Sequence, residues 1–383
     1  MPSESVLVVA GETSGEHHAA GLIAQIRLQN PGLELQWFGS GGPAMAEAGV
    51  ELLGHVSDLS AIGPRAALGQ MRHYWKLYRR ILDRCGKQRT RLAVLVDFPE
   101  FNLLLARRLR QMRIPVCYFI GPQVWAWRPG RIDRIRECVD LMLVILPFEE
   151  EYYRSRGVEA HYVGNPTKGF LGSVVRQREV PKAGEVPVVA LLPGSRRREV
   201  ELIFPALLEA AVRVSREIPV RFVVSRAPEI RREQLASIQR RWMDGKAPSL
   251  DLEIVEKEPG WQVLSRATCA VVKSGTSTLE ATVLGIPFAM VYRISWASWL
   301  FARPLVSTDT YCLANLVAGR RIVQEFVQRE ATGEKIASYL LETLKDAGRR
   351  CEIARDLDKA SEKLGNWDAY QQGAAHVSRL LSD

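Results

Sequence analysis

The sequence repeats one pattern over most of its length: a short apolar run, a turn rich in glycine and polar residues, and then an amphipathic stretch. Runs such as 92–96 (LAVLV) and 141–146 (LMLVIL) are apolar at every position and do not alternate with polar residues. Strands of this kind are buried on both faces, as in a parallel sheet covered by helices. Their alternation with helical stretches predicts an α/β protein.

The predicted elements fall into two groups. The first has strands at 6–10, 35–39, 92–96 and 116–120, with helical stretches at 16–29, up to 84, and at 101–112. A Gly-Asn-Pro break at 164–166 opens a polar stretch that ends at Pro187. The pattern then restarts with a strand at 188–192 and continues to a strand at 287–292. We therefore predict two doubly wound, Rossmann-like units in tandem.

These groups define the predicted domains. The first covers residues 1–165 and the second residues 166–349, while a helix at 350–383 is expected to return to the first domain. A chain of 383 residues is long enough for two domains, each with its own hydrophobic core. A cleft between the domains is the expected place for a site.

The composition is that of a folded protein. Hydrophobic residues make up 47% of the chain and charged residues 25%, which excludes a disordered, collagen-like or coiled-coil chain. The six cysteines are scattered without a CxxC pair, so neither a zinc site nor a disulfide framework is expected, and a reducing cytoplasm fits best. The N-terminus has no signal-peptide pattern, and no apolar run reaches the roughly 18 residues of a membrane span.

The net charge is +9, from 52 Lys and Arg against 43 Asp and Glu. Such an excess admits nucleic acid, an anionic membrane or a phosphorylated substrate as a partner, and it also occurs in proteins with none of these. The positions of the basic residues in the sequence have to distinguish between these partners.

Ligands of open parallel sheets bind beyond the carboxyl ends of the strands, so the loops after the predicted strands are the candidate sites. The first strand is followed by GETSGE, which contains Gly11, Glu12, Ser14 and Gly15. Its glycines permit close backbone approach, and its helix-start N–H groups suit an anion or a sugar hydroxyl. The loop matches neither GxGxxG nor a P-loop, and a plain glycine turn with Ser14 as helix cap is the alternative.

A carboxylate follows the most apolar strand. Asp97 comes directly after LAVLV and precedes Phe-Pro-Glu-Phe-Asn. It can act as a general base on a substrate hydroxyl, with Glu100 and Asn102 close by to orient the reactants. The alternative is an N-cap for the helix that begins near Pro99.

The first strand of the second group ends in LPGSRRRE, which contains Ser195 and Arg196. Three arginines at a helix start oppose the helix macrodipole, and a bound diphosphate reverses that penalty. The alternative is a solvated basic turn.

A later strand ends in KSGTSTLE. Gly275 and Thr276 stand at the predicted helix start, and Glu280 follows one turn later. Helix-start N–H groups and small hydroxyl residues can hold a phosphate, and the carboxylate can accept both hydroxyls of a ribose. The alternative is a Ser/Thr cap with a surface glutamate.

Longer segments occur in a fixed order from residue 11 to residue 325: GETSGE, DFPEFN, PQVWAWRPGRI, LPFEEEYY, LLPGSRRREVE, KSGTSTLEA and LANLVAGRRIVQE. In these segments the chain resembles the lipid-A-disaccharide synthase family, inverting glycosyltransferases of GT-B architecture, with two Rossmann-like domains that face each other across a cleft. The resemblance implies transfer of 2,3-diacylglucosamine from its UDP conjugate to 2,3-diacylglucosamine 1-phosphate (lipid X). The products are the β-1,6-linked lipid A disaccharide 1-phosphate and UDP.

The resemblance also implies roles for matching residues. Asp97 matches the essential aspartate that would deprotonate the acceptor 6-hydroxyl, and Arg196 matches the essential arginine that would neutralise the departing diphosphate. The positions expected to bind the donor are Ser195, Gly275, Thr276, Glu280 and Asn315. The positions expected on the acceptor side are Gly11, Glu12, Ser14, Gly15, Gln123 and Trp125, the last two as a rigid wall. No metal or other cofactor is implied, because UDP is both the donor's carrier and a product.

Two features depart from the family pattern. Where relatives commonly carry Gly-His after the LPFE segment, this chain has Gly164 and Asn165, so no catalytic histidine is assigned there. The C-terminal segment from Gly365 onward departs from the commoner glycine- and alanine-rich ending.

Two segments combine aromatic and basic residues in the way of interfacial helices. The segment 62–81 includes Leu68, Met71 and Trp75, and the segment 295–306 includes Trp296 and Trp299. We expect both to contact acyl chains and an anionic membrane, so that the protein is cytoplasmic and peripheral to the inner membrane. The alternative is a core-packing helix with a solvated basic face. The family resemblance also leaves a homodimer open.

Three other functions are alternatives to this interpretation. Another GT-B UDP-sugar transferase or a UDP-sugar epimerase would share the Gly-Ser/Thr turn with its following glutamate, but the aromatic segments favour a lipid substrate. A nucleic-acid-binding protein is disfavoured because the basic residues are dispersed and form no known binding module. A catalytically silent membrane adaptor is disfavoured because Asp97, Arg196 and Glu280 are all present.

Overall fold

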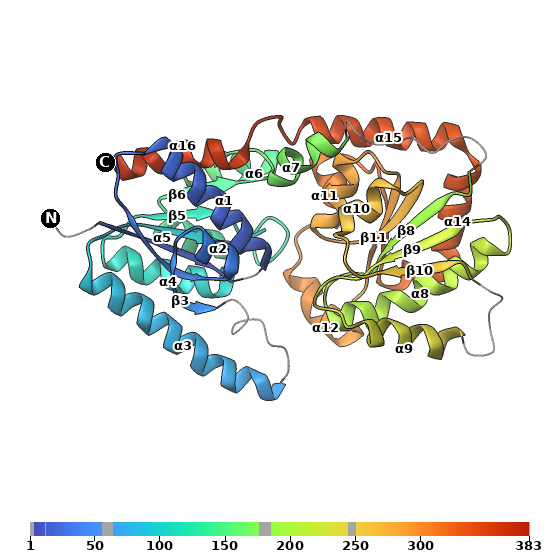
Figure 1. Cartoon of the computed structure of the whole chain (residues 1–383), viewed down its shortest axis with the longest axis horizontal. Helices are drawn as coiled ribbons and strands as arrows, with labels where there is room; N and C mark the ends of the chain where they lie inside the picture. Colours follow the sequence, from blue (N-terminus) through green and yellow to red (C-terminus); the bar gives the residue numbers. More distant parts are fainter. Residues whose placement is uncertain (1–3, 12, 56–63, 176–184, 244–249, 383) are drawn as a thin grey trace. The chain divides into compact units, whose positions relative to one another are not determined.

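The structure is a computed structural model that describes residues 4–11, 13–55, 64–175, 185–243, 250–382 of the chain. It divides into two compact units, each presented by itself below (Figure 1). The first unit comprises Met1–Pro166 and Trp367–Asp383, and the second comprises Thr167–Asn366.

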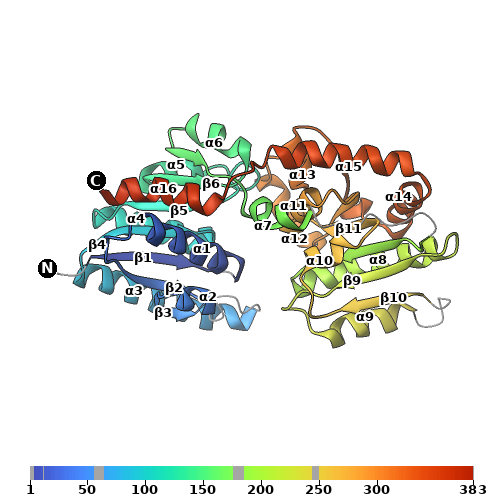
Figure 2. The ribbon, with the colours of Figure 1, turned by 45° about the horizontal axis from the view of Figure 1, so that its top comes forward.

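The first unit is built on a parallel sheet with the strand order β3-β2-β1-β4-β5-β6-β7 (Figure 2). Its strands are β1 (Ser5–Ala10), β2 (Gln36–Gly41), β3 (Glu51–His55), β4 (Thr90–Val96), β5 (Val116–Phe119), β6 (Leu141–Val144) and β7 (Ala160–Tyr162). Its helices are α1 (Thr13–Gln29), α2 (Pro43–Glu47), α3 (Pro64–Lys87), α4 (Pro99–Gln111), α5 (Arg131–Cys138), α6 (Pro147–Arg154) and α16 (Ala369–Ser382).

Helices cover both faces of this sheet, which explains why its central strands are apolar throughout. Val6 and Val8 of β1 pack with residues of α1 and α16 on one face. Leu7 and Val9 pack with residues of α3, α4 and α5 on the other. Successive side chains of a strand point to opposite faces, so a strand covered on both sides needs apolar residues at every position.

The second unit has a parallel sheet with the order β10-β9-β8-β11-β12-β13. Its strands are β8 (Val188–Leu192), β9 (Arg221–Ser225), β10 (Leu252–Val255), β11 (Cys269–Lys273), β12 (Phe288–Tyr292) and β13 (Gln324–Val327). Its helices are α8 (Arg197–Ser215), α9 (Arg232–Met243), α10 (Gly260–Ser265), α11 (Thr276–Val283), α12 (Trp296–Ala302), α13 (Leu313–Ala318), α14 (Gly333–Lys345) and α15 (Ala347–Glu362), together with α7 (Pro166–Val175), which begins at the last residue of the first unit's main segment.

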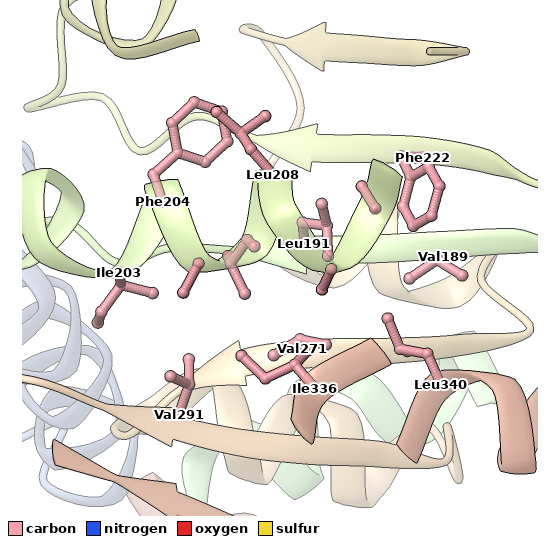
Figure 3. Packing of buried hydrophobic residues seen from close by; sticks show 14 of the residues in the cluster. Val189, Leu191, Ile203, Phe204, Leu208, Phe222, Val271, Val291, Ile336 and Leu340 are labelled. Atoms are coloured by element: carbon pink, nitrogen blue, oxygen red, sulfur yellow. The ribbon is translucent and has the colours of Figure 1, made fainter. Parts of the chain in front are cut away.

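The core of the second unit lies between its sheet and the helices α8 and α14. Figure 3 shows Phe204 and Leu208 of α8 and Leu340 of α14 around the buried strand residues Val189 and Phe222. The two doubly wound sheets confirm the predicted α/β fold class. In each sheet the first three strands are added toward one edge and the later strands toward the other. This switch point lies between β1 and β4 in the first unit and between β8 and β11 in the second. Such a switch point is where open α/β sheets bind ligands.

The C-terminal segment is divided between the units rather than being one returning helix. The predicted helix at 350–383 is two helices in the structure: α15 belongs to the second unit and α16 to the first. Trp367 stands at the start of the returning segment, and its indole N–H donates to the carbonyl of Val163 at 3.0 Å. Helix α16 then packs along α1, where Tyr370 Oη lies 2.9 Å from His18 Nδ1 (Figure 1).

Candidate active site

The loops after β1 and β4 lie side by side in the first unit, because Ala10 and Val96 are paired at the ends of these strands. A Cβ atom built on Gly15 would lie 3.9 Å from the Val96 carbonyl oxygen, so the start of α1 reaches the end of β4. The sheet therefore brings Gly11, Ser14, Gly15 and Asp97 together. We call this group the Asp97 edge.

The turn at the Asp97 edge has a backbone conformation that L-amino acids rarely adopt. Asp97 and Phe98 have φ values of 48° and 51°, both in the left-handed region. Non-glycine residues in that region cost roughly 1–3 kcal/mol each and gather at functional sites. The N-cap residue of α4 is Phe98 and not Asp97. The alternative that Asp97 serves as the helix cap is therefore wrong.

Gly11 makes room for this turn. A Cβ atom at Gly11 would lie 2.1 Å from Cγ of Phe98, closer than two non-bonded carbon atoms can approach. Ser14 is exposed in the first turn of α1, which begins at Thr13, so Ser14 is not the residue that precedes the helix. Glu12 lies outside the described residues.

Sequence reasoning did not single out Glu16, which is 5% exposed in the first turn of α1. Its Oε2 atom has no hydrogen-bond partner among the residues that the structure describes. A Cβ atom at Gly42 would lie 2.1 Å from this oxygen, so the glycine after β2 leaves the space that the carboxylate fills. Only the packing of α1 against this loop distinguishes Glu16 from a surface residue of the helix.

Trp125, predicted as a wall residue, is held by a buried acid. Its indole N–H donates to Glu149 Oε1 at 2.9 Å, and the ring packs edge-on against Phe148. Glu149 also accepts from the backbone N–H of Leu146, at the start of α6. Burial raises the pKa of the Glu149 carboxyl to about 7, against the smaller opposing effect of these hydrogen bonds. Gln123, the other predicted wall residue, is exposed.

The equivalent loops of the second unit follow β8 and β11, which are also neighbours. Gly194, with φ 112°, turns the chain after β8, and the exposed residues Ser195 and Arg196 follow it. Glu199 is buried and lies within 3.7 Å of the Arg196 guanidinium and 3.2 Å from Lys273 Nζ. We call this group, with Gly275, Thr276 and Glu280, the Arg196 edge.

Lys273 at the end of β11 was not predicted as a site residue. Desolvation lowers the pKa of its amine, and the neighbouring Glu199 carboxylate works in the opposite direction. One buried carboxylate thus fixes two cations at the carboxyl ends of adjacent strands. The sequence signal was the Lys that opens KSGTSTLE, but only the pairing of β8 with β11 shows that it meets Glu199.

The loop after β11 combines a glycine in a backbone conformation that other residues rarely adopt with the start of a helix. Gly275 has φ 145° and is the N-cap residue of α11. No atom lies within 4 Å of a Cβ built on it, so its backbone borders open space within the described structure. Thr276 is exposed at the first position of α11. Together they present helix-start N–H groups, as anion binding requires.

Glu280 lies one turn further along α11. Burial raises the pKa of its carboxyl, and a hydrogen bond from Ser277 partly offsets this. A Cβ at Gly260 would lie 3.6 Å from Glu280 Oε2, 3.7 Å from the Ser225 hydroxyl oxygen and 3.2 Å from a methyl of Leu192. The carboxylate therefore lies near the ends of β8 and β9, and Glu280 is only partly exposed, against the surface-glutamate alternative.

Asn315, predicted as a donor-binding residue, makes four hydrogen bonds within its own unit. Its amide nitrogen donates to the Val323 carbonyl and to Glu325 Oε1, and its oxygen accepts from the backbone N–H groups of Ile322 and Val323. These four bonds use both N–H groups and both lone pairs of the amide. The structure therefore makes Asn315 a residue that holds the chain before β13.

Asn165, at the position of the missing histidine, is buried and donates to the Ile145 carbonyl at 3.0 Å. It fastens the end of the first unit's main segment to the loop after β6. In the described part of the chain, no group of three or more His, Cys, Asp or Glu side chains is arranged to hold a metal ion.

The two predicted membrane segments differ. Leu77 and Ile81 of α3 are buried against the first unit's sheet, so this part of the helix packs in the core, while Trp75 remains 47% exposed. The side chains of Leu68 and Met71 lie outside the described residues. None of the described helices is both long enough and apolar enough to cross a membrane.

Helix α12 has no buried residue. Trp296, Leu300 and Phe301 are 56%, 65% and 79% exposed, whereas Trp299 is half-buried beside Tyr311. The guanidinium of Arg329 lies 4.8 Å from the centre of the Trp296 ring. A groove of about 810 Å³ in the same unit is lined by residues that include Trp299, Arg303, Tyr311 and Arg321, and none of the predicted donor-binding residues lines it.

Comparison with known proteins first defines the class. The fold matches a putative UDP-N-acetylglucosamine 2-epimerase from Listeria monocytogenes with a TM-score of 0.68 at 11% identity, over 99% of this chain and 95% of that one. It matches the calicheamicin glycosyltransferase with a TM-score of 0.58 at 16% identity, over 100% and 98%. Two doubly wound units with these neighbours define the GT-B architecture of glycosyltransferases and related epimerases.

The sequence comparisons are more specific. Residues 6–378 match the family model of lipid-A-disaccharide synthetase. The lipid-A-disaccharide synthase of Myxococcus xanthus (strain DK1622) is 38% identical over 382 residues, which are 98% of this chain and 97% of that protein. The chain belongs to the lipid-A-disaccharide synthase family, and it is a glycosyltransferase of lipid A biosynthesis.

Proposed function

We propose that the protein transfers 2,3-diacylglucosamine from UDP-2,3-diacylglucosamine to lipid X and forms the β-1,6-linked lipid A disaccharide 1-phosphate and UDP. The family match over nearly the whole chain supports this reaction. The observation that carries the residue assignment is the strained turn that presents Asp97 at the switch point of the first sheet. A surface aspartate without a functional role would not need such a strained turn.

In the proposed mechanism Asp97 is the general base. Its carboxylate takes the proton of the acceptor 6-hydroxyl as that oxygen bonds to C1 of the donor sugar. The bond between C1 and the diphosphate oxygen breaks, its electron pair leaves with UDP, and a single in-line displacement inverts C1. General base catalysis of this kind contributes roughly 10²–10⁴-fold to a rate.

The Arg196 edge is proposed to bind UDP. Arg196 and the N–H groups at Gly275 and Thr276 would meet the negative charge that develops on the diphosphate, and Glu280 would accept the ribose hydroxyls. Arg196 is 62% exposed and Lys273 lies on the same buried glutamate, so two cations are available to an anion without a metal ion. We therefore propose that the reaction needs no metal.

A direct assay tests the reaction and its metal dependence. Purified protein is incubated with UDP-2,3-diacylglucosamine and lipid X in EDTA, and the products are identified by mass spectrometry. We expect disaccharide 1-phosphate and UDP in equal amounts. Absence of the disaccharide would overturn the proposal, and epimerisation of a UDP-sugar would support the epimerase alternative. A requirement for added Mg²⁺ would overturn metal independence alone.

We further propose that α12 docks the protein onto the anionic cytoplasmic surface of the inner membrane. The support is its exposed Trp296, Leu300 and Phe301 beside Arg303 and Arg329. Aromatic and basic side chains together suit the interface of an anionic bilayer. The exposed Trp75 of α3 is a second contact in this proposal.

Co-sedimentation with phosphatidylglycerol vesicles tests the docking. Phe301→Ser should lower the bound fraction severalfold, and high salt should lower it further. Leu28→Ser is the matched control, because Leu28 is 72% exposed on α1 of the first unit. Equal binding by both variants would overturn the role of α12. The oligomeric state stays a prediction, which sedimentation velocity can check.

A further inference from the structure

The turn at Asp97 has to be held in place by its surroundings. Asp97 and Phe98 are consecutive non-glycine residues in the left-handed region. At roughly 1–3 kcal/mol each, the two would relax to an ordinary turn unless specific contacts opposed this. Those contacts decide where the Asp97 carboxylate lies.

Two buried side chains meet at the backbone carbonyl of Asp97. Asn102 Nδ2 donates to it at 2.7 Å, and the Tyr118 hydroxyl donates to it at 2.5 Å. Asn102 is in α4 and Tyr118 is in β5, and both are fully buried. One carbonyl oxygen has two lone pairs, so these donors saturate it from two different elements of the fold.

The tyrosine keeps its proton. Burial, reinforced by the charge of Asp97, raises the pKa of the Tyr118 hydroxyl well above its ordinary value. The group is therefore a hydrogen-bond donor throughout the pH range in which an enzyme works. Asn102 Nδ2 reaches a second carbonyl, that of Val96, at 3.3 Å, which ties the turn to the end of β4.

Packing closes the other side of the turn. The Phe98 ring stacks on Phe101 with 5.8 Å between ring centres and lies 5.7 Å from the ring of Tyr74. On the opposite side it covers Gly11, where a Cβ atom would lie 2.1 Å from the ring. The ring cannot turn away without losing this contact, so Phe98 and the clamped carbonyl hold the turn from two directions.

We propose that Tyr118 and Asn102 are positioning residues that hold Asp97 in its strained turn and so set the geometry of proton removal. This inference rests on the proposed role of Asp97 as general base. Neither residue touches the substrate in this proposal, and each acts through the Asp97 carbonyl. Displacement of a catalytic group by about 1 Å can cost about 100-fold in rate, so a hydrogen bond to the backbone can control catalysis.

The variant Tyr118→Phe removes one donor and keeps the ring. We expect kcat to fall by about 10- to 100-fold while KM for each substrate changes less than about threefold. Tyr153→Phe is the matched control, because its buried hydroxyl also donates to a backbone carbonyl at 2.5 Å, that of Pro122 and not that of Asp97. Both variants should lose similar thermal stability, but only Tyr118→Phe should lose kcat. Asn102→Leu, which removes the other donor to the Asp97 carbonyl, is the second test of this clamp, the pair of hydrogen bonds from Tyr118 and Asn102.

A double-mutant cycle separates positioning from a general loss of structure. In an Asp97→Asn background, Tyr118→Phe should lower the residual rate by less than about twofold, since there is no base left to misplace. If Tyr118→Phe costs the same factor in both backgrounds, or no more than Tyr153→Phe, the clamp is overturned. If Asp97→Asn itself is nearly as active as the wild type, the proposed base fails instead, so the two failures are distinguishable.

Discussion

The Asp97 edge and the Arg196 edge occupy the same place in two sheets that share the order of six strands, yet they are built in opposite ways. Asp97 stands on a strained backbone that is clamped by buried donors and wedged by aromatic rings. Arg196 stands on an exposed turn, its side chain is 62% open to solvent, and its guanidinium lies 3.7 Å from the Glu199 carboxylate. A proton acceptor needs a fixed geometry, whereas a cation that neutralises a diphosphate acts over a longer range.

The largest effect is expected from Asp97→Asn. Asparagine tolerates the left-handed conformation and keeps the shape of the side chain, so the variant removes only the charge. We expect kcat to fall at least about 100-fold, with the midpoint of thermal unfolding nearly unchanged. Asp133→Asn, on the exposed surface of α5, is the control and should retain activity. A rate near that of the wild type would remove Asp97 from the mechanism.

Arg196→Ala should cost about as much or slightly less. Removing the guanidinium leaves the departing diphosphate without its main cation, so kcat should fall by about 100-fold. Arg213→Ala is the matched control, because Arg213 lies in the last turn of α8, is 47% exposed and is already paired with Glu209 at 3.0 Å. The comparison between the edges would fail if Arg196→Ala unfolded the protein, or if both arginine variants lost activity equally.

Glu280→Gln should affect donor binding more than turnover. We expect KM for the UDP-sugar and the inhibition constant for free UDP to rise by about tenfold together, because the ribose hydroxyls lose a charged acceptor. The raised pKa of this carboxyl means that protonation begins at a higher pH than for an ordinary glutamate. Donor affinity of the wild type should therefore weaken on acidification, and the variant should lose that dependence. Glu209→Gln, on α8, is the control.

The last prediction concerns the stability of the protein rather than its activity, at the buried Glu149 that holds Trp125. The pKa of Glu149 rises from 4.5 to about 7 on folding, so below pH 4.5 the acid is protonated in both states and its stabilising contribution is complete. That contribution is lost as pH rises through about 7, where burial opposes the ionised form. The loss is on the order of 3 kcal/mol.

Urea unfolding of the wild type and of Glu149→Gln at pH 5 and pH 8 measures this contribution. The glutamine variant should lose less free energy of unfolding between the two pH values than the wild type does. Parallel pH dependences in the two proteins would contradict the assignment. The Arg196 edge provides the contrast, because UDP affinity should not follow the titration of Glu149.

Much of the fold followed from the sequence pattern. The predicted strands at 6–10, 92–96 and 188–192 match β1, β4 and β8 to within two residues at each end. They were predictable because parallel strands covered on both faces must be apolar throughout. The strands β3, β7 and β13 were not predicted, because none of them is an uninterrupted apolar run.

The partners of polar side chains were less predictable. The four hydrogen bonds of the Asn315 amide within its own unit were not predicted. Lys273 was passed over, although it meets Glu199. The partner of Lys273 is set by the pairing of β8 with β11, and strand order cannot be read from the local sequence.

The sequence by itself determined the two α/β units, the loops that end their strands, and the family to which the chain belongs, because these depend on local periodicity and on long ordered motifs. The tertiary structure decided that α3 buries Leu77 and Ile81 in the core, that the C-terminal segment is shared between the units, and that Tyr118 reaches the carbonyl of Asp97. Those outcomes depend on contacts between residues far apart in the chain. Only the packed sheet and its helices fix such contacts.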